Sequence, residues 1–416
     1  MKQIITFLGI FLFSFFKMNA QETSSVEQKI ESIFAPLSEL MNTIVFYSVK
    51  VGSVKLPFII IAIVIAAIFF TIFLNFANVR LMPVALKILK GEAEAKDQID
   101  EPEETGQVTP FQALATALSA SVGIGNIGGV AIAIALGGAG ATFWMIIAGL
   151  LAMSVKMIEA TLGVKYREVG EDGQVYGGPM YYLKNGLAEM KLPKLGKVLA
   201  YAYALFLVFG SFGASMFQSN QAVVQAQKLM GLESPLGLAV ALLALVGFVI
   251  VGGVKRIGKV AEKIVPMMGI LYVGSALIIL GLNYELIPST ISLMLSEAFN
   301  VNSFAGGVIG VLIVGFQRAF FSNEAGLGTS SIAHAAVKTR YAASEGIVGA
   351  IEPFVDTVIV CTMTAMVIVL MNLKLNLFDY GSVTDSAVIH NQTGESVGGV
   401  ELTSVSYTHL TLPTIA

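Results

Sequence analysis

Stretches without a charged residue alternate along this chain with short segments that carry several charges. A helix needs about 20 apolar residues to cross the hydrocarbon core of a bilayer, and these stretches are long enough. The one between Glu104 and Lys156 has room for two crossings, with a turn at 136–141. The pattern predicts an all-α polytopic membrane protein with eight spans, at 56–78, 109–136, 141–163, 198–228, 236–254, 264–283, 303–334 and 344–372.

Composition supports one membrane domain rather than two or three soluble ones. Of the 416 residues, 55% are hydrophobic and 13% are charged, whereas a soluble domain has about 25% charged residues. A net charge of −3 argues against nucleic acid as a partner. The single cysteine, Cys361, excludes an intramolecular disulfide and is expected to pack inside an apolar run.

The chain begins like a secreted or membrane protein. Lys2, an apolar stretch from Ile4 to Phe16 and the small residue Ala20 are typical of a signal peptide at 1–20; an uncleaved anchor is the alternative. Residues 21–55 would then form a short extracytoplasmic segment before the transmembrane domain at 56–372.

The distribution of Lys and Arg predicts the orientation, because cytoplasmic connections carry an excess of positive charge. The connections 229–235 and 283–302 contain no Lys or Arg. We therefore expect a multi-pass protein of a bacterial-type inner (plasma) membrane with its N-terminus outside. The basic residues gather in alternate segments, namely 80–96, 165–197, 255–263 and 338–340.

The sequence GIGNIG at 123–128 has the G-x-G-x-x-G spacing of a dinucleotide-binding loop. That interpretation needs a strand before the loop and an acidic residue about 20 positions after it. The preceding stretch is Ala-rich and helical in character, and no charged residue follows before Lys156. We therefore reject a nucleotide cofactor for this loop.

Two spans are interrupted in the same way, the second by VGIGNIGG at 122–129 and the seventh by FFSNEAGLG at 320–328. Unwound backbone in a membrane is tolerated only where it is buried or lines a cavity. Transporters with inverted repeats place such breaks at corresponding positions of their two halves. The two spans are five apart and cross in opposite directions, as a five-helix inverted repeat requires. Close helix packing through glycine is the alternative.

Several long motifs resemble the alanine or glycine:cation symporter family. They are ATALSASVGIGNIGGVAIAIALGGAGATFWM, VKYRE with GGPMYYLKNGL, FQSNQAV and GFQRAFFSNEAGLGTSSIAHAAVKT, and the resemblance extends from Phe111 to Leu370. It implies a LeuT-type five-plus-five inverted repeat with one extra N-terminal helix. It also implies a secondary active symporter that moves alanine or glycine into the cell with Na⁺, or with H⁺ in some members, by alternating access. Neither an enzyme activity nor a cofactor or protein partner is expected.

A small neutral amino acid brings a carboxylate, an ammonium and a short side chain. The half-helix that starts near Gly125 suits the carboxylate through its N–H groups and dipole, and glycine lets substrate approach the backbone. Gln218 resembles the family's substrate-contacting glutamine, with an interhelical hydrogen bond as the alternative. Ile124 stands where the family often has Thr. The candidate substrate residues are Gly123, Ile124, Gly125, Asn126, Gln218, Phe321 and Ser322.

Oxygen atoms at the two breaks are candidates for the Na⁺ site. Ser119, Ser121 and Val122 would contribute carbonyl oxygens, and Asn126, Asn323 and Asp356 would contribute side chains.

Three carboxylates lie at membrane depth, and a buried carboxylate there indicates function. Asp356 is the better candidate for cation coupling, with Glu352 one turn before it and Glu324 in the second break. For Glu324, an ion pair with Arg318 or another basic residue is the alternative.

Two other functional classes remain open. An intramembrane enzyme would need a nucleophile or metal motif, but the chain has neither H-E-x-x-H nor G-x-S-x-G. Of its three histidines, His390 and His409 lie near the C-terminus and His334 stands alone. A channel is the other class, because glycine-rich broken helices also line pores.

The chain turns polar after the eighth span, and no further span follows Leu373. We expect an incomplete second repeat and a polar tail at 373–416 that is truncated or foreign at its end. A reduced fold is the alternative.

We predict that the 416-residue chain inserts poorly and shows no gradient-driven alanine uptake, because alternating access needs both repeats. Adding three C-terminal helices of the family's kind should restore uptake in proteoliposomes. Saturable, ion-coupled uptake by the chain as written would show that this view of its C-terminus is wrong.

Overall fold

The computed structural model describes residues 47–51, 54–92, 106–171, 173–231, 236–301, 307–384 and 387–408, with five single positions before Tyr47. The predicted signal peptide at 1–20 lies outside these residues. The chain divides into two compact units, Met1–Ala62 and Ile63–Ala416.

The first unit contains a short antiparallel hairpin. Strand β1 (Ser48–Val51) pairs with β2 (Val54–Pro57), and Phe58 N–H donates to the Tyr47 carbonyl at 2.8 Å where helix α3 (Phe58–Phe73) begins.

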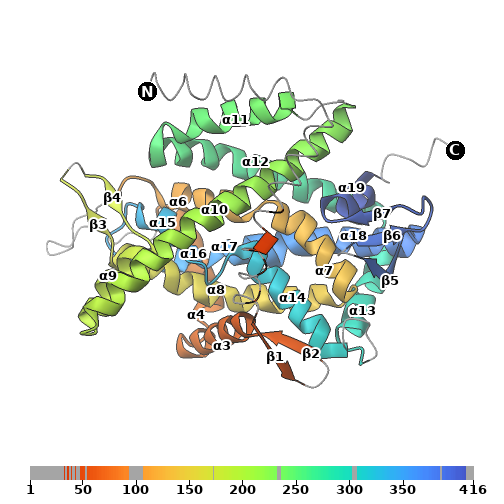
Figure 1. Cartoon of the computed structure of the whole chain (residues 1–416), viewed down its shortest axis with the longest axis horizontal. Coiled ribbons are helices and arrows are strands. Elements are labelled where there is room, and N and C mark those ends of the chain that lie inside the picture. The colour runs from red at the N-terminus through yellow and green to blue at the C-terminus, as the bar shows by residue number, and fades with distance from the viewer. Residues whose placement is uncertain are drawn as a thin grey trace. The chain divides into compact units, whose positions relative to one another are not determined.

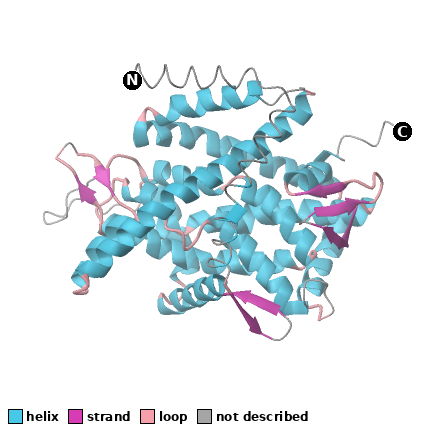
Figure 2. Cartoon of the chain, in the orientation of Figure 1, coloured by secondary structure: helices cyan, strands magenta, loops and turns pink. Residues whose placement is uncertain are grey.

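The second unit is mostly helical (Figures 1 and 2). Its helices are α4 (Ala77–Arg80), α5 (Met82–Leu89), α6 (Pro110–Ser121), α7 (Val130–Gly137), α8 (Ala141–Lys165), α9 (Pro179–Glu189), α10 (Pro193–Met230), α11 (Leu236–Ile250), α12 (Gly253–Leu282), α13 (Ile287–Ala298), α14 (Gly307–Asn323), α15 (Ser330–Ala335), α16 (Ala342–Gly349), α17 (Ile351–Pro353), α18 (Thr362–Leu375) and α19 (Val400–Thr408). Two π-helical turns, η1 (Gly125–Gly129) and η3 (Phe354–Cys361), and a 3₁₀ turn, η2 (Tyr284–Leu286), join some of them.

Every predicted span contains an apolar helix. Among the described residues, α8, α10, α12 and the continuous run Ala342–Leu375 are long and apolar enough to cross a membrane alone. The bent pair Pro110–Ser121 and Gly125–Gly137 makes a fifth. Shorter apolar helices fall in the remaining predicted spans, at Phe58–Phe73, Gly237–Ile250 and Gly307–Asn323. The chain is therefore built as a multi-pass membrane protein.

Helix α8 is the packing centre of the second unit. It contacts α14, α15, α16 and α17, which come from the other end of the sequence. Small residues make these contacts close: an added Cβ at Gly149 would lie 2.9 Å from the Thr357 side chain, and one at Gly163 would lie 2.6 Å from the Ser331 carbonyl. The Ala- and Gly-rich composition thus allows helix backbones to approach one another, as is common in membranes.

Two connections contain more structure than the hydropathy pattern indicates. The basic cluster 255–263 lies on the first turns of α12, because that helix begins at Gly253 rather than near 264. Segment 165–197 contains the hairpin β3 (Glu168–Val169) and β4 (Val175–Tyr176), followed by α9. Lys184 on α9 donates to Glu168 at 3.0 Å, and this hydrogen bond lowers the pKa of the Glu168 carboxyl below its usual value.

Much of the polar tail folds into structure. Strands β5 (Phe378–Thr384), β6 (Ala387–His390) and β7 (Ser396–Gly398) form an antiparallel sheet in that order, followed by α19. Thr403 on α19 donates to the Ile127 carbonyl at 3.0 Å, and Tyr407 stacks on Tyr272 of α12. Helix α19 therefore packs against the first interrupted helix and is hydrogen-bonded to it.

We predict that Gly315→Ala destabilises the protein by about 1–3 kcal/mol, the usual cost of overpacking. Its Cβ would lie 2.6 Å from the Ala141 carbonyl, where α14 meets α8. Gly274→Ala on α12 is the matched control, since its Cβ meets nothing within 4 Å. Thermal unfolding in detergent checks both, and equal melting temperatures for the two variants would contradict the close α8–α14 contact.

Candidate functional site between two interrupted helices

The first interruption lies where sequence analysis placed it. Helix α6 begins with a capping box between Thr109 and Gln112 and ends at Val122, whose backbone is extended. The chain then restarts as η1 and α7 at an angle of 54° to α6. The Asn126 side-chain oxygen accepts a hydrogen bond from Gly123 N–H at 2.7 Å, so this asparagine closes the unwound segment on itself.

The second interruption repeats this arrangement. Helix α14 ends at Asn323, and the next residues include Glu324, Gly326 and Gly328, with φ of 54°, 91° and 76°. Positive φ is easy for glycine and strained for other residues, which explains the glycines of this motif. The Asn323 side-chain oxygen accepts from Ala325 N–H at 3.0 Å, so an asparagine again supports the break.

Asp356 joins the two interruptions. Its fully buried carboxylate accepts hydrogen bonds from Asn126 Nδ2 at 2.7 Å, from Ser322 Oγ at 2.9 Å and from Thr357 Oγ1 at 2.9 Å. The thiol of Cys361 lies 3.4 Å from Asn126 Nδ2 and 3.3 Å from Ser322 Oγ. Asp356 belongs to the π-helical segment η3, which lies within the eighth span. One carboxylate therefore holds the two breaks together.

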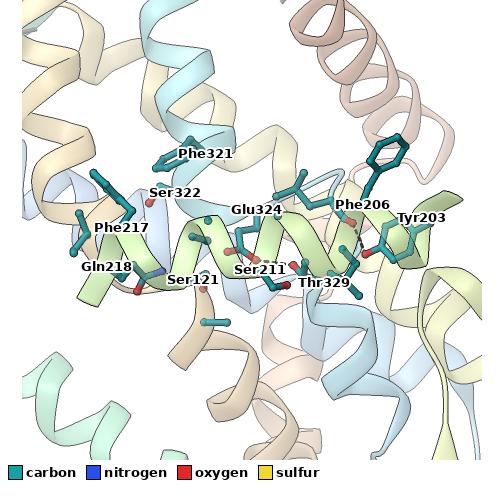
Figure 3. A pocket seen from close by; sticks show the side chains of 18 residues that line it. Ser121, Tyr203, Phe206, Ser211, Phe217, Gln218, Phe321, Ser322, Glu324 and Thr329 are labelled. Carbon is teal, nitrogen blue, oxygen red and sulfur yellow. Dashed lines mark hydrogen bonds between the residues drawn. The ribbon is translucent and has the colours of Figure 1, made fainter. Parts of the chain in front are cut away.

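A cavity of about 590 Å³ lies beside this junction (Figure 3). Figure 3 shows Ser322, Phe321, Phe217 and Gln218 toward one end of the row of labelled side chains, Glu324 and Ser211 near its middle and Tyr203 toward the other end. Most of its lining is apolar. The lining residues are Ala120, Ser121, Ile124, Gly125, Tyr203, Phe206, Leu207, Gly210, Ser211, Gly213, Ala214, Phe217, Gln218, Phe321, Ser322, Glu324, Leu327 and Thr329.

The candidate substrate residues gather at one end of this cavity. Ile124, Gly125, Gln218, Phe321 and Ser322 line it. The approach is close: an added Cβ at Gly125 would lie 3.1 Å from the Ser322 Cα atom, and one at Gly123 would lie 3.1 Å from Gln218 Oε1.

The candidate cation residues are divided by the structure. Ser121 lines the cavity, whereas Asn126, Asn323 and Asp356 lie buried behind it. Val122 lines a separate apolar pocket with Val265 and Pro266. Ser119 lies on an exposed part of α6, where its hydroxyl donates to the Thr116 carbonyl. The side chains that meet are those of Asn126, Ser322 and Asp356.

Apart from Gln218, the α10 face of the cavity was not predicted from the sequence. Tyr203, Leu207, Gly210, Ala214 and Phe217 recur at spacings of three and four and line the cavity as one helical face. Tyr203 Oη also donates to the Leu327 carbonyl in the second break at 2.8 Å. This spacing of small and aromatic residues is visible in the sequence of span 198–228. An apolar helix that only packs against its neighbours has the same spacing, so the pattern does not identify a cavity.

The membrane-depth carboxylates have other partners than those considered for them. Glu324 accepts a hydrogen bond from Thr329 at 2.6 Å, and the described residues show no ion pair between Glu324 and Arg318. Glu352 pairs with Lys156 of α8 at 2.9 Å. Glu352 has different partners from Asp356, because its carboxylate lies beside Lys156 and His334 whereas that of Asp356 lies beside Asn126 and Ser322. Lys156 and Glu159, both inside span 141–163, were overlooked.

These features define a multi-pass membrane protein with a cavity between two interrupted helices. The model of the sodium:alanine symporter family matches residues 38–412, which includes most of the polar tail. The chain belongs to this family, whose members are transporters and not enzymes.

Several relatives support the assignment. The chain is 40% identical over 320 residues to the sodium/alanine symporter AgcS of Methanococcus maripaludis, a match over 76% of this chain and 68% of the relative. It is 38% identical over 342 residues to an uncharacterized transporter of Haemophilus influenzae, over 81% and 72% of the two chains. It is 35% identical over 311 residues to a Bacillus subtilis protein named "Probable sodium/glutamine symporter GlnT", over 74% and 62%. The match thus spans about two thirds of the length of these relatives.

We predict that Tyr203→Phe loosens the second break, because it removes the donor to the Leu327 carbonyl, a loss worth about 0.5–1.5 kcal/mol. Backbone hydrogen exchange at 324–329 should become several-fold faster. Tyr201→Phe on the same helix is the control, since Tyr201 is 77% exposed. Unchanged exchange in Tyr203→Phe would mean that this hydrogen bond does not hold the break.

Proposed function

We propose that this chain forms the substrate and ion site of a secondary active symporter, which moves alanine or glycine into the cell together with Na⁺. The observation that carries the proposal is the cavity of about 590 Å³ where the two interrupted helices meet α10. Its volume lies in the range of about 300–1,000 Å³ that is typical of small-molecule sites.

The substrate carboxylate would lie at the start of the helix Gly125–Gly137. This end of the helix faces the cavity through Ile124 and Gly125, and the positive end of the helix dipole favours an anion there. The absence of a side chain at Gly125 leaves the backbone accessible. The side-chain oxygens of Gln218 and Ser322 would accept hydrogen bonds from the substrate ammonium.

The substrate side chain would face the apolar part of the cavity. Phe217 and Phe321 line the same end as Gln218, and burying a charged side chain against them without a partner would be costly. A small neutral side chain therefore suits this end. The cavity also extends along α10 toward Tyr203. The length of the substrate side chain, rather than its polarity, would therefore distinguish alanine from a longer neutral amino acid.

The coupling Na⁺ would enter the junction at Asp356. Na⁺ is a hard cation, and oxygen atoms are the ligands that such cations prefer. In the structure the Asp356 carboxylate is balanced by hydrogen-bond donors from Asn126, Ser322 and Thr357. Rotation of the Asn126 amide and of the two hydroxyls would turn oxygen lone pairs toward a cation beside the carboxylate. The carbonyl oxygens of Ser121 and Val122 lie at the end of α6, and the Asn323 side chain lies at the end of α14.

Such an ion site would link Na⁺ to substrate. Ser322 lines the cavity and also donates to Asp356, while Asn126 lies one residue from Gly125. A cation that draws Asn126 and Ser322 together would therefore shape both sides of the substrate site. This is the differential binding that coupled transport requires.

The architecture that we propose is the LeuT-type repeat, with α6–α7 and α14–α15 as the paired interrupted helices. Alternating access would come from rocking of one helix bundle against the other around the junction. We place the N-terminus outside a bacterial-type plasma membrane, and we expect no protein partner.

We predict that Asn126→Leu abolishes Na⁺-dependent alanine uptake while the protein still inserts. The test uses proteoliposomes of the chain extended by three C-terminal helices of the family's kind, with alanine uptake measured at several Na⁺ concentrations. A symporter should saturate with alanine and stop when the Na⁺ gradient collapses, whereas a channel should do neither.

The control is Asn78→Leu. Asn78 is also a buried asparagine, whose Nδ2 donates to the Leu150 carbonyl at 2.9 Å, so its loss tests for general destabilisation. We expect Asn78→Leu to keep the Na⁺ dependence of uptake. Normal uptake by Asn126→Leu with unchanged Na⁺ dependence would exclude Asn126 from the ion site.

A further inference from the structure

Four ionisable side chains meet behind the second break, outside the cavity. They are Lys156 on α8, His334 on α15, Glu345 on α16 and Glu352 on α17, and each side chain is at most 1% exposed. Lys156 Nζ lies 2.9 Å from Glu352 Oε1. His334 lies between the two carboxylates, with Nδ1 2.5 Å from Glu345 Oε1 and Nε2 3.8 Å from Glu352 Oε2. We call these four residues the buried tetrad.

Several atoms of the tetrad have no hydrogen-bond partner among the described residues. They are His334 Nε2, Glu345 Oε2 and Glu352 Oε2. Buried polar atoms are nearly always paired, and an unpaired one is costly. An imidazole ring with a proton on each nitrogen would direct one N–H toward Glu345 and the other toward Glu352, so the ring position suits the doubly protonated form.

The charges around the tetrad favour the same form. Other charged side chains that act on the tetrad are Glu159 on α8 and Glu324 in the break, through Lys156, and Arg167 beyond α8, through Glu345. Glu159 accepts from Gly326 N–H, and Arg167 donates to the Ala335 carbonyl. The four carboxylates in this region thus outnumber the two basic side chains, Lys156 and Arg167. An uncompensated charge is costly inside a membrane protein, and a proton on His334 reduces the excess.

We propose that His334 is a proton-binding site, at which one proton is held as an imidazolium between Glu345 and Glu352. This site is separate from the amino-acid cavity and from the Asp356 junction. It stands independently of the symport proposed above, because it concerns the charge state of the folded chain.

The bound proton would stabilise the far side of the second break. Helix α15 carries His334 and begins at Ser330, whose hydroxyl accepts a hydrogen bond from Lys156 at 2.9 Å. The imidazolium ties α15 to α16 through Glu345, and Lys156 ties the start of α15 to α8. Release of the proton would leave negative charge beside the break and weaken the attachment of α15 to α16. The conformation of the break therefore becomes sensitive to pH.

Nitrogen NMR of the chain labelled with ¹⁵N-histidine tests the proposal directly. The chain has three histidines, His334, His390 and His409, and His334→Gln identifies the signal of interest by its loss. At pH 7.5 an ordinary histidine is about one-tenth protonated. We expect both ring nitrogens of His334 to be protonated at this pH in detergent-solubilised protein.

Variants test the charge argument. Glu345→Gln removes the carboxylate beside Nδ1, so we expect the doubly protonated fraction of the His334 ring at pH 7.5 to fall. The folded protein should hold a proton that the unfolded chain releases, so stability should fall as pH rises above about 6.5. The melting temperature should thus fall between pH 6.5 and 8.5 in the unmodified chain and change much less in His334→Gln.

His390→Gln is the matched control. His390 lies on β6, where its Nδ1 accepts from backbone N–H groups of Gln392 and Thr393, and its loss should leave the pH dependence unchanged. A neutral His334 ring at pH 7.5 in the unmodified chain would overturn the proposal. An equal fall in melting temperature with and without His334 would do so as well. Neither the protonation of His334 in the unmodified chain nor the comparison of melting temperatures depends on Glu345→Gln, so both test the proposal even if that variant does not fold.

Discussion

The structure depends on one constraint: a helix that is interrupted inside a membrane must find hydrogen-bond partners for its unwound backbone within the protein. Asn126 and Asn323 meet part of this need locally, each by accepting from a backbone N–H of its own break. The fully buried Asp356 carboxylate then joins the breaks by accepting from Asn126 and Ser322. Because Ser322 also lines the cavity, this junction connects the stability of the breaks with the proposed ligand site.

Close packing makes this junction possible. The breaks approach one another closely at Gly125, where an added Cβ would lie 3.1 Å from the Ser322 Cα atom. Helix α8 meets α14 and α16 through glycine and other small residues. It also carries Lys156, which neutralises Glu352 in the middle of the bundle. Buried ion pairs of this kind contribute little net stability, but removing one partner is strongly destabilising. The polar side chains of α8 therefore restrict how its neighbours can be arranged.

Much of the membrane architecture was predictable from local patterns, for physical reasons. Charge-free runs locate membrane helices because an unpaired charge is costly in lipid, and every predicted span contains an apolar helix. Gly326 and Gly328 indicate a break because glycine adopts positive φ easily, and both residues have positive φ in the structure. The family follows from long motifs, and the family model matches residues 38–412. Which amino acid and which ion are carried stays a prediction.

Sequence alone thus determined the spans, the two breaks and the family, since each depends on residues that are close together in the chain. Only the tertiary structure decided which residues contact one another across the fold. Lys156 and Glu352 are 196 positions apart and Asn126 and Asp356 are 230 apart, so no local pattern relates them. The cavity face of α10 has the same period as a packing face, and His334 stands alone in sequence yet lies 2.5 Å from Glu345. Contacts between residues so far apart in the sequence are set by helix packing, which is why the buried tetrad can be recognised only in the folded chain.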